Sequence, residues 1–223
     1  DKYRNYVLLT WKTIYSLKEG KPMTTTKSPI PLELAKTAFL PIDLQKGIVN
    51  SGQLFPYDAT TILSNNQLIA EQLKHTPAWN ILVNVDITSF QYLSAKNDRA
   101  QAGAFYTPPK EFTDLLLEPT TKGTQNTLTI TKHNPSAFFG TSLDAQLRRR
   151  KIDTLILSGV ATSNGVYATA LDAFQHGYHV IVIEDGCSDR DLELHTLFFE
   201  KMFPKTARVR TTKEILQAIE EAR

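Results

Sequence analysis

The chain has 223 residues, enough for one well-filled hydrophobic core and short for two. Its composition, 41% hydrophobic and 22% charged, is that of an ordinary globular protein, and no apolar run approaches the roughly 18 residues that a membrane-spanning helix needs. The 25 basic and 23 acidic residues leave a net charge of +2, too small for a nucleic-acid-binding surface unless the excess is clustered.

The first 22 residues differ from the rest of the chain. They carry five basic and two acidic residues, a net charge of +3, so the remaining residues carry −1. Two interpretations stay open: residues 1–22 are an extension ahead of a start at Met23, or a native N-terminal arm that packs on a neighbouring molecule. We expect the functional domain to span residues 23–223. Because this main body is slightly acidic, we expect no nucleic-acid partner. Because no apolar run is long enough to span a bilayer, we expect no membrane partner.

After this segment, short apolar runs recur along the chain. Each is rich in Leu, Ile, Val or Phe and lacks strict alternation, which is typical of strands buried on both faces of a parallel sheet. The predicted strands are Thr37–Ile42, Asn80–Val85, Thr127–Ile130, Asp153–Ser158, His179–Ile183 and Ala207–Arg210.

Between the runs, apolar residues recur at helical spacing, and Gly177 is placed to end one of the helices. The predicted helices are Thr60–Lys74, Ser142–Arg150, Asn164–His176, Glu193–Met202 and Lys213–Ala222. Alternating strands and helices indicate an α/β sheet with right-handed crossovers. The irregular segment Asp86–Leu117, rich in polar residues and Pro, is expected to be a functional loop or lid.

Ligands of open α/β sheets bind outside the carboxyl ends of the strands. Asp43 follows the first strand, Lys132 follows the third, and a glycine-bearing helix start, 162–166, follows the fourth. A carboxylate beside an ammonium in a partly dry cleft suits acid–base chemistry, and free N–H groups at a helix start suit an oxyanion or a carboxylate. Each feature alone has a structural explanation, as a turn cap, a solvated lysine or close packing. Their co-location favours a site.

Three motifs carry a resemblance to a known family. They are Asp43-Leu-Gln, Lys132 four residues before Ser136-Ala-Phe-Phe-Gly, and Gly159-Val-Ala-Thr-Ser-Asn-Gly-Val. In this order they resemble the isochorismatase-like hydrolases, from about Thr37 to the C-terminus. The resemblance implies a Rossmann-like three-layer α/β/α sandwich around a six-stranded, mostly parallel sheet of order 3-2-1-4-5-6. It also implies a non-proline cis peptide at Val160–Ala161.

Family members that hydrolyse amides use an Asp–Lys–Cys triad, whose positions fall here on Asp43, Lys132 and Gly165. Since Gly165 has no thiol, the covalent amidase mechanism lacks its nucleophile. Isochorismatases proper also have Gly there and cleave a vinyl ether, releasing pyruvate. The resemblance then makes Asp43 the general acid, while Lys132 tunes its pKa and holds a substrate carboxylate. Because an adjacent ammonium lowers an Asp pKa, burial or substrate charge must offset it.

We expect further substrate contacts from the same motifs. The expected binding residues are Gln45, Phe138, Ala161, Thr162 and Asn164. The five histidines lack ligand spacing, so we expect neither a metal nor another cofactor. The single cysteine, Cys187, favours a reducing cytoplasm, and the family habit implies a homo-oligomer.

The leading hypothesis is therefore an isochorismatase-family hydrolase that acts by Asp43/Lys132 acid–base chemistry on a small anionic substrate, with isochorismate as one candidate. The alternative is a non-catalytic ligand-binding or scaffold protein that has lost the thiol nucleophile. A third hypothesis is an amidase that uses Cys187 as its nucleophile.

Overall fold

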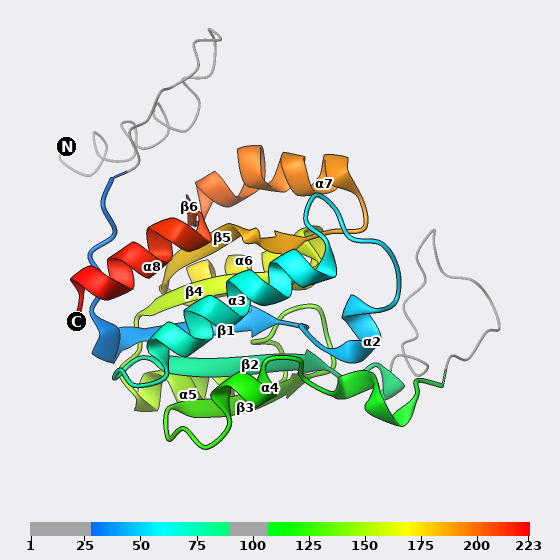
Figure 1. The fold of residues 1–223 in the computed structure, drawn as a ribbon, viewed down its shortest axis with the longest axis horizontal. Coiled ribbons are helices and arrows are strands. Elements are labelled where there is room, and N and C mark those ends of the chain that lie inside the picture. The colour runs from blue at the N-terminus through cyan, green and yellow to red at the C-terminus, as the bar shows by residue number, and fades with distance from the viewer. Residues whose placement is uncertain (1–27, 90–106) are drawn as a thin grey trace, which may run out of the picture. The chain divides into compact units, whose positions relative to one another are not determined.

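The computed structural model describes residues 28–89 and 107–223, so the predicted segment 1–22 lies outside the described residues. The chain divides into two units, Asp1–Ile30 and Pro31–Arg223, and the second contains a six-stranded parallel sheet of order β3-β2-β1-β4-β5-β6 (Figure 1). The strands are β1 Thr37–Ile42, β2 Trp79–Val85, β3 Thr127–Lys132, β4 Thr154–Val160, β5 His179–Ser188 and β6 Arg208–Arg210. The predicted fold class and strand order are confirmed.

Helices cover both faces of the sheet, with α3 (Ala59–Leu73) and α8 (Thr212–Glu221) on one face and α5 (Leu143–Arg149) and α6 (Tyr167–Gln175) on the other (Figure 1). The other helical elements are η1 Leu34–Lys36, α2 Lys46–Val49, η3 Lys110–Thr113, α4 Glu118–Thr121, η4 Thr162–Val166, α7 Leu192–Leu197, η5 Phe198–Met202 and η6 Phe203–Lys205. η4 and η5 are π-helical turns, so two of the helices predicted as continuous are each divided.

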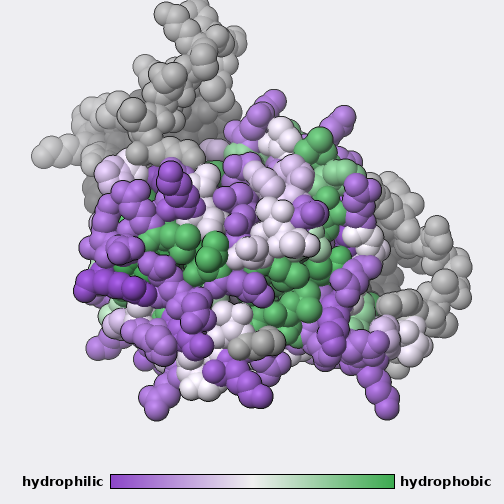
Figure 2. All heavy atoms as spheres, in the orientation of Figure 1, coloured by the Kyte–Doolittle hydropathy of each residue, from purple (hydrophilic) through white to green (hydrophobic). Residues whose placement is uncertain are grey.

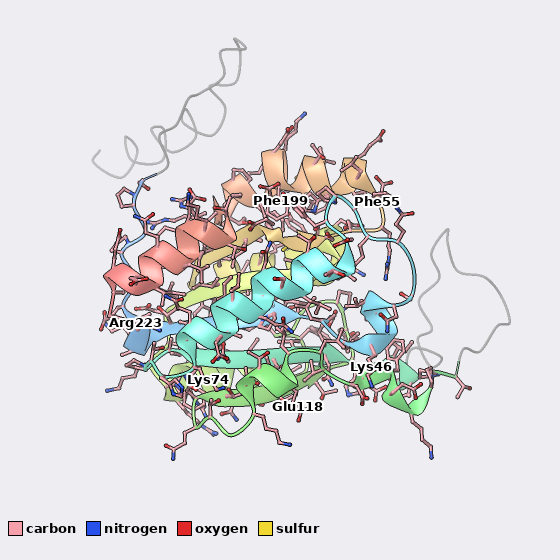
Figure 3. All side chains as sticks on the ribbon, viewed as in Figure 1. Lys46, Phe55, Lys74, Glu118, Phe199 and Arg223 are labelled. Carbon is pink, nitrogen blue, oxygen red and sulfur yellow. The ribbon has the colours of Figure 1, made fainter. Side chains whose placement is uncertain are left out.

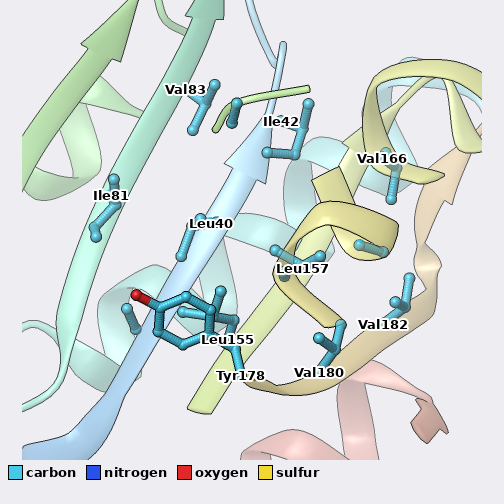
Figure 4. Packing of buried hydrophobic residues seen from close by; sticks show 14 of the residues in the cluster. Leu40, Ile42, Ile81, Val83, Leu155, Leu157, Val166, Tyr178, Val180 and Val182 are labelled. Carbon is cyan, nitrogen blue, oxygen red and sulfur yellow. The ribbon is translucent and has the colours of Figure 1, made fainter. Parts of the chain in front are cut away.

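The central strands read as apolar runs because both of their faces are buried. Every residue of β1 is buried, as are the last six of β2 and of β4. On the α6 side, Leu40, Ile42, Leu157 and Val182 pack together (Figure 4). Burying one such side chain contributes about 1.5–3 kcal/mol. This packing fixes the ends of β1 and β4, where the chain turns out of the sheet.

The two ends of the sheet carry different connections. Lys46 of α2 and Phe55, in the loop before α3, lie at the carboxyl end of the strands, whereas Lys74 and Arg223 lie at the amino end (Figure 3). The carboxyl end is therefore framed by the connection from β1 to α3. A mostly hydrophilic surface, with apolar residues gathered across its middle, covers the face seen in Figure 2.

Across residues 28–89 and 107–223, none of the helices has both the length and the apolar character required to cross a membrane.

Candidate active site

An aspartate and a lysine from two different strands meet at the carboxyl end of the sheet. Asp43 directly follows β1, and Lys132 is the last residue of β3. The Lys132 Nζ lies 2.8 Å from the Asp43 Oδ2, and the two side chains are 2% and 7% exposed. With so little water around them, the two charges interact more strongly than a surface pair does.

The backbone of Asp43 has an unusual conformation. Its φ is +53°, in the left-handed region that a residue with a Cβ enters at a cost of about 1–2 kcal/mol. Its N–H still donates to the Val83 carbonyl, at 2.9 Å, as if β1 continued. The chain thus leaves the sheet abruptly at Asp43, and such local strain is typical of functional sites.

The Lys132 ammonium is held by three acceptors. Besides Asp43, its Nζ donates to the carbonyls of Pro135, at 2.9 Å, and Asn134, at 3.3 Å. An ammonium has three N–H donors, so all of them are used. Lys132 therefore orients and neutralises Asp43, and no N–H remains for the substrate carboxylate that the sequence analysis assigned to it.

Burial and the ammonium act on Asp43 in opposite directions. Burial raises the pKa of Asp43, the Lys132 charge and hydrogen bond lower it, and burial dominates, so that the pKa rises to about 6. The second carboxyl oxygen, Oδ1, is buried and has no hydrogen-bond partner in the described part of the chain. Asp43 thus has one oxygen engaged with Lys132 and one available.

Gly165 lies against this pair, within η4. A Cβ built on Gly165 would stand 3.0 Å from the Asp43 Oδ2 and 3.3 Å from the Lys132 Nζ. The residues just before η4 include the cis peptide bond Val160–Ala161, as the resemblance implied. The predicted trio of Asp43, Lys132 and Gly165 is therefore brought together, and the glycine leaves just enough room for the pair.

A pocket of about 230 Å³ opens over these three residues. Of the predicted binding residues, Ala161 and Asn164 line it. Its lining consists of Asp43, Ile48, Ser51, Val85, Ile87, Lys132, Asn134, Pro135, Val160, Ala161, Asn164, Gly165 and Arg190.

Three predicted binding residues have other surroundings and are corrected here. Gln45 is fully buried, and its amide bonds to the main chain at Val85 and Phe112. The Phe138 ring is buried in the core, where it stacks on His176. The Thr162 hydroxyl bonds to the ring of His195 at 2.8 Å. None of the three side chains lines the pocket, because each is engaged inside the protein.

The sequence analysis missed Arg190, a cation that lines the pocket. Its guanidinium donates to the carbonyls of Ile48, Gly52 and Gln53 and to the Ser51 hydroxyl, so it ties the connection after α2 to the end of β5. Among the described residues no carboxylate forms an ion pair with it. The signal was present, since Arg190 follows a strand, but β5 was expected to end at Ile183.

The other candidate chemistries lack support among the described residues. Cys187 is completely buried in β5, burial raises the pKa of its thiol, and it does not line the pocket. No group of three or more His, Cys, Asp or Glu side chains within residues 28–89 and 107–223 is arranged to hold a metal ion. An amidase mechanism that uses Cys187 is therefore contradicted, because a buried neutral thiol cannot reach a substrate.

Comparison with known proteins decides the family. Residues 37–214 match the model of the isochorismatase domain. The chain belongs to the isochorismatase family. The isochorismatase-family proteins YwoC of Bacillus subtilis and YecD of Escherichia coli are similar to it, at 38% and 33% identity over 84% and 85% of this chain and 96% and 100% of theirs. A solved isochorismatase-family structure from Burkholderia thailandensis has a TM-score of 0.75 and 30% identity, covering 86% of this chain and 99% of that one. As a member of this family, the protein is a hydrolase.

Proposed function

We propose that this isochorismatase-family hydrolase cleaves a small anionic enol ether, with Asp43 as the general acid. The observation that carries the proposal is the Asp43–Lys132–Gly165 arrangement. It combines a buried carboxyl group, whose pKa is raised to about 6 and whose Oδ1 has no partner in the described residues, with a nucleophile position that has no side chain. Such a site supplies a proton and provides no covalent route.

The reaction requires one proton and one water molecule. Protonated Asp43 transfers its proton to the terminal carbon of the enol double bond, which leaves an oxocarbenium ion on the ether carbon. Water adds to that carbon and releases a proton, which restores the acid form of Asp43. The hemiketal then breaks its C–O bond, giving a ketone and an alcohol. Lys132 stabilises the Asp43 carboxylate that forms after the first step, so it assists without touching the substrate.

The charges that line the pocket favour an anionic substrate. Lys132 and Arg190 each carry a positive charge, and Asp43 is the one acidic residue among the described lining residues. The pocket is thus positive whether Asp43 is protonated or ionised. The four terminal N–H groups of Arg190 are taken by neutral acceptors, and no carboxylate among the described residues forms an ion pair with it. We therefore assign the electrostatic attraction of the substrate carboxylate to the charge of Arg190. The cavity volume of about 230 Å³ suits a small metabolite.

Similar proteins act on small molecules of this kind. Over 87 residues the chain is 32% identical to a probable isochorismatase of Pseudomonas chlororaphis, and over 90 residues it is 34% identical to the maleamate amidohydrolase of Pseudomonas putida. These matches cover 39% and 40% of the chain. The absence of a side chain at Gly165 favours the first reaction over amide hydrolysis.

The test is an assay for the hydrolysis of enol-pyruvyl ethers, including isochorismate. The release of pyruvate measures the reaction. Asp43→Asn keeps the shape of the side chain but cannot donate the proton, so we expect kcat/KM to fall about 100-fold or more. Asp144→Asn is the matched control, because Asp144 pairs with Arg148 on α5 and does not line the pocket. It should retain wild-type activity.

Two results contradict the proposal. Unchanged pyruvate release by Asp43→Asn would remove the acid from the mechanism. Binding without turnover across enol-ether and amide panels would favour a ligand-binding protein instead.

A further inference from the structure

The β1–β2 ladder is interrupted where Asp43 turns out of the sheet. In a parallel ladder, a residue that donates its N–H to one partner accepts, through its own carbonyl, the N–H two residues further along that partner strand. Asp43 donates to the Val83 carbonyl at 2.9 Å, so its own carbonyl should accept from the Val85 N–H. Its left-handed φ of +53° turns the carbonyl away, and this bond is absent between these two described residues.

The side chain of Gln45 makes the missing bonds. Its Oε1 accepts from the Val85 N–H at 2.7 Å, and its Nε2 donates to the Val85 carbonyl at 3.0 Å. A regular ladder would have used the Asp43 carbonyl and the Gln45 N–H for the same two groups. The buried carboxamide thus acts as a substitute peptide. Its second amide hydrogen goes to the Phe112 carbonyl, also at 3.0 Å.

The bonds at Val85 connect the two members of the acid–base pair. Val85 is aligned with Lys132 in the β2–β3 register, and the next N–H, that of Asp86, donates to the Lys132 carbonyl at 2.9 Å. β2 lies between the strands that supply Asp43 and Lys132. The Gln45 amide therefore ties the turn that carries Asp43 to the part of β2 that holds Lys132.

We propose that Gln45 is a positioning residue for this site, whose carboxamide takes the place of a peptide group in the β1–β2 ladder and so holds Asp43 in the left-handed conformation that brings its carboxylate to Lys132. The catalytic consequence rests on the acid role proposed for Asp43. The geometric claim does not depend on any substrate. Without the amide, the Val85 N–H and carbonyl lose their partners, and Asp43 gains by returning to extended backbone.

A titration cycle tests the positioning directly. The ¹³C chemical shift of the Asp43 carboxyl group is measured by NMR as a function of pH. The signal is assigned by its absence from the spectrum of Asp43→Asn. In the wild type, Lys132→Met should raise the Asp43 midpoint, because the ammonium lowers that pKa. In a Gln45→Met background the same substitution should shift the midpoint by about half as much or less, since the two groups no longer hold their 2.8 Å contact. An equal shift in both backgrounds overturns the proposal.

Asn80→Leu is the matched control, because the Asn80 side chain is also a completely buried amide, which lies at the amino end of β2 and donates to the Ala70 carbonyl. In the Asn80→Leu background, Lys132→Met should shift the Asp43 midpoint as much as it does in the wild type. A smaller shift in this control as well would mean that any loss of a buried amide disturbs the site, which would overturn the proposal. Should Gln45→Met not fold, Gln45→Glu retains the acceptor for Val85 and removes the donor. In the Gln45→Glu background, Lys132→Met should then shift the Asp43 midpoint by less than it does in the wild type. An equal shift in both backgrounds would overturn the proposal.

Activity gives a second readout that separates the two proposals. If the enol-ether reaction is correct, Gln45→Met should lower kcat about tenfold or more and leave KM within about twofold, because the amide does not line the pocket. If no enol ether is turned over, the proposed function fails, while the titration cycle still decides the role of Gln45.

Discussion

Protonation of a single carboxyl group controls the chemistry proposed for this site. The pKa of Asp43 is raised from 3.8 to about 6 by burial, so the acid form is the majority species below that pH and a minority above it. A general acid acts in its protonated form. We therefore expect kcat/KM to fall as pH rises through about 6, by about tenfold per pH unit well above the midpoint. A pH–rate profile from about pH 4 to 8, roughly two units on each side of that pKa, measures it. Activity that rises with pH in this range would indicate a base or a nucleophile instead.

The cation at the pocket wall makes a prediction about substrate binding. Arg190→Gln removes the charge that we expect to attract the substrate carboxylate. Two unit charges about 4 Å apart interact by roughly 1–4 kcal/mol near a protein surface, so KM should rise about tenfold or more. Arg148→Gln, at an exposed ion pair on α5, is the control and should leave KM unchanged.

The charge itself can be separated from the structural role of Arg190, which also bonds the connection after α2. A substrate analogue with a carboxamide in place of the carboxylate should bind the wild type and Arg190→Gln about equally. If the variant weakens both ligands alike, loosening of the connection explains the effect and the carboxylate assignment fails.

The residues of the site were predictable to different degrees. Asp43, Lys132 and Gly165 were found because each follows a strand, and strand ends in a parallel sheet converge. Arg190 was missed because β5 runs to Ser188, five residues past Ile183, where its continuous apolar run ends. The role of Gln45 was beyond reach, since it depends on the backbone turn at Asp43, which no residue pattern specifies.

At the scale of elements, the apolar runs located the strands well. β1 was predicted with its observed bounds, and β2 and β4 begin within one residue of the prediction. The helices were less predictable, because a π-helical turn alters the hydrogen-bond pattern without altering the apolar spacing. The segment predicted as one helix over 164–176 begins with η4, which is the element that places Gly165 in the site.

The packing of α7 against η4 gives a prediction about stability. His195 of α7 is buried, and its Nδ1 lies 2.8 Å from the Thr162 Oγ1 at the start of η4. Burial lowers the pKa of His195 from 6.5 to about 4. The unfolded chain then binds more protons than the folded one between these values, so this residue's contribution to stability is lost as pH falls from about 6.5 to 4.

His195→Gln should remove that loss. The free energy of unfolding, measured by urea denaturation at several pH values, should fall toward acid more steeply in the wild type than in the variant, by about 2–3 kcal/mol over the window. The difference between the two proteins is the readout, since Asp43 titrates in the same range with the opposite sign and is common to both. A pH-independent difference would mean that His195 is not held neutral in the fold.

At the scale of the whole molecule, the strand order came from the resemblance carried by three motifs, whereas composition and spacing indicated only an α/β class. Several strand orders accommodate six buried parallel strands, and the choice among them depends on non-local packing that the apolar pattern does not record. The order 3-2-1-4-5-6 places β1 and β4 side by side, and thereby Asp43 next to Gly165.

The limits of the functional domain lead to the last prediction. Among the described residues, the unit Pro31–Arg223 contains all six strands of the sheet, the helices that cover it and the residues that line the pocket. A chain of residues 23–223 should therefore unfold at a temperature within about 2 °C of the full chain and keep its hydrolase activity, because it retains all the strands and lining residues that the structure describes.

A longer deletion provides the contrast. Residues 37–223 lose the buried side chain of Leu34 and the Lys36 carbonyl, which accepts from the Asp153 N–H at 3.0 Å beside the start of β4. This deletion should cost roughly 2–4 kcal/mol of unfolding free energy. Calorimetry of both deletions measures the difference. If the two deletions destabilise the protein equally, residues 1–22 belong to the folded domain, because their removal alone would then cost folding free energy.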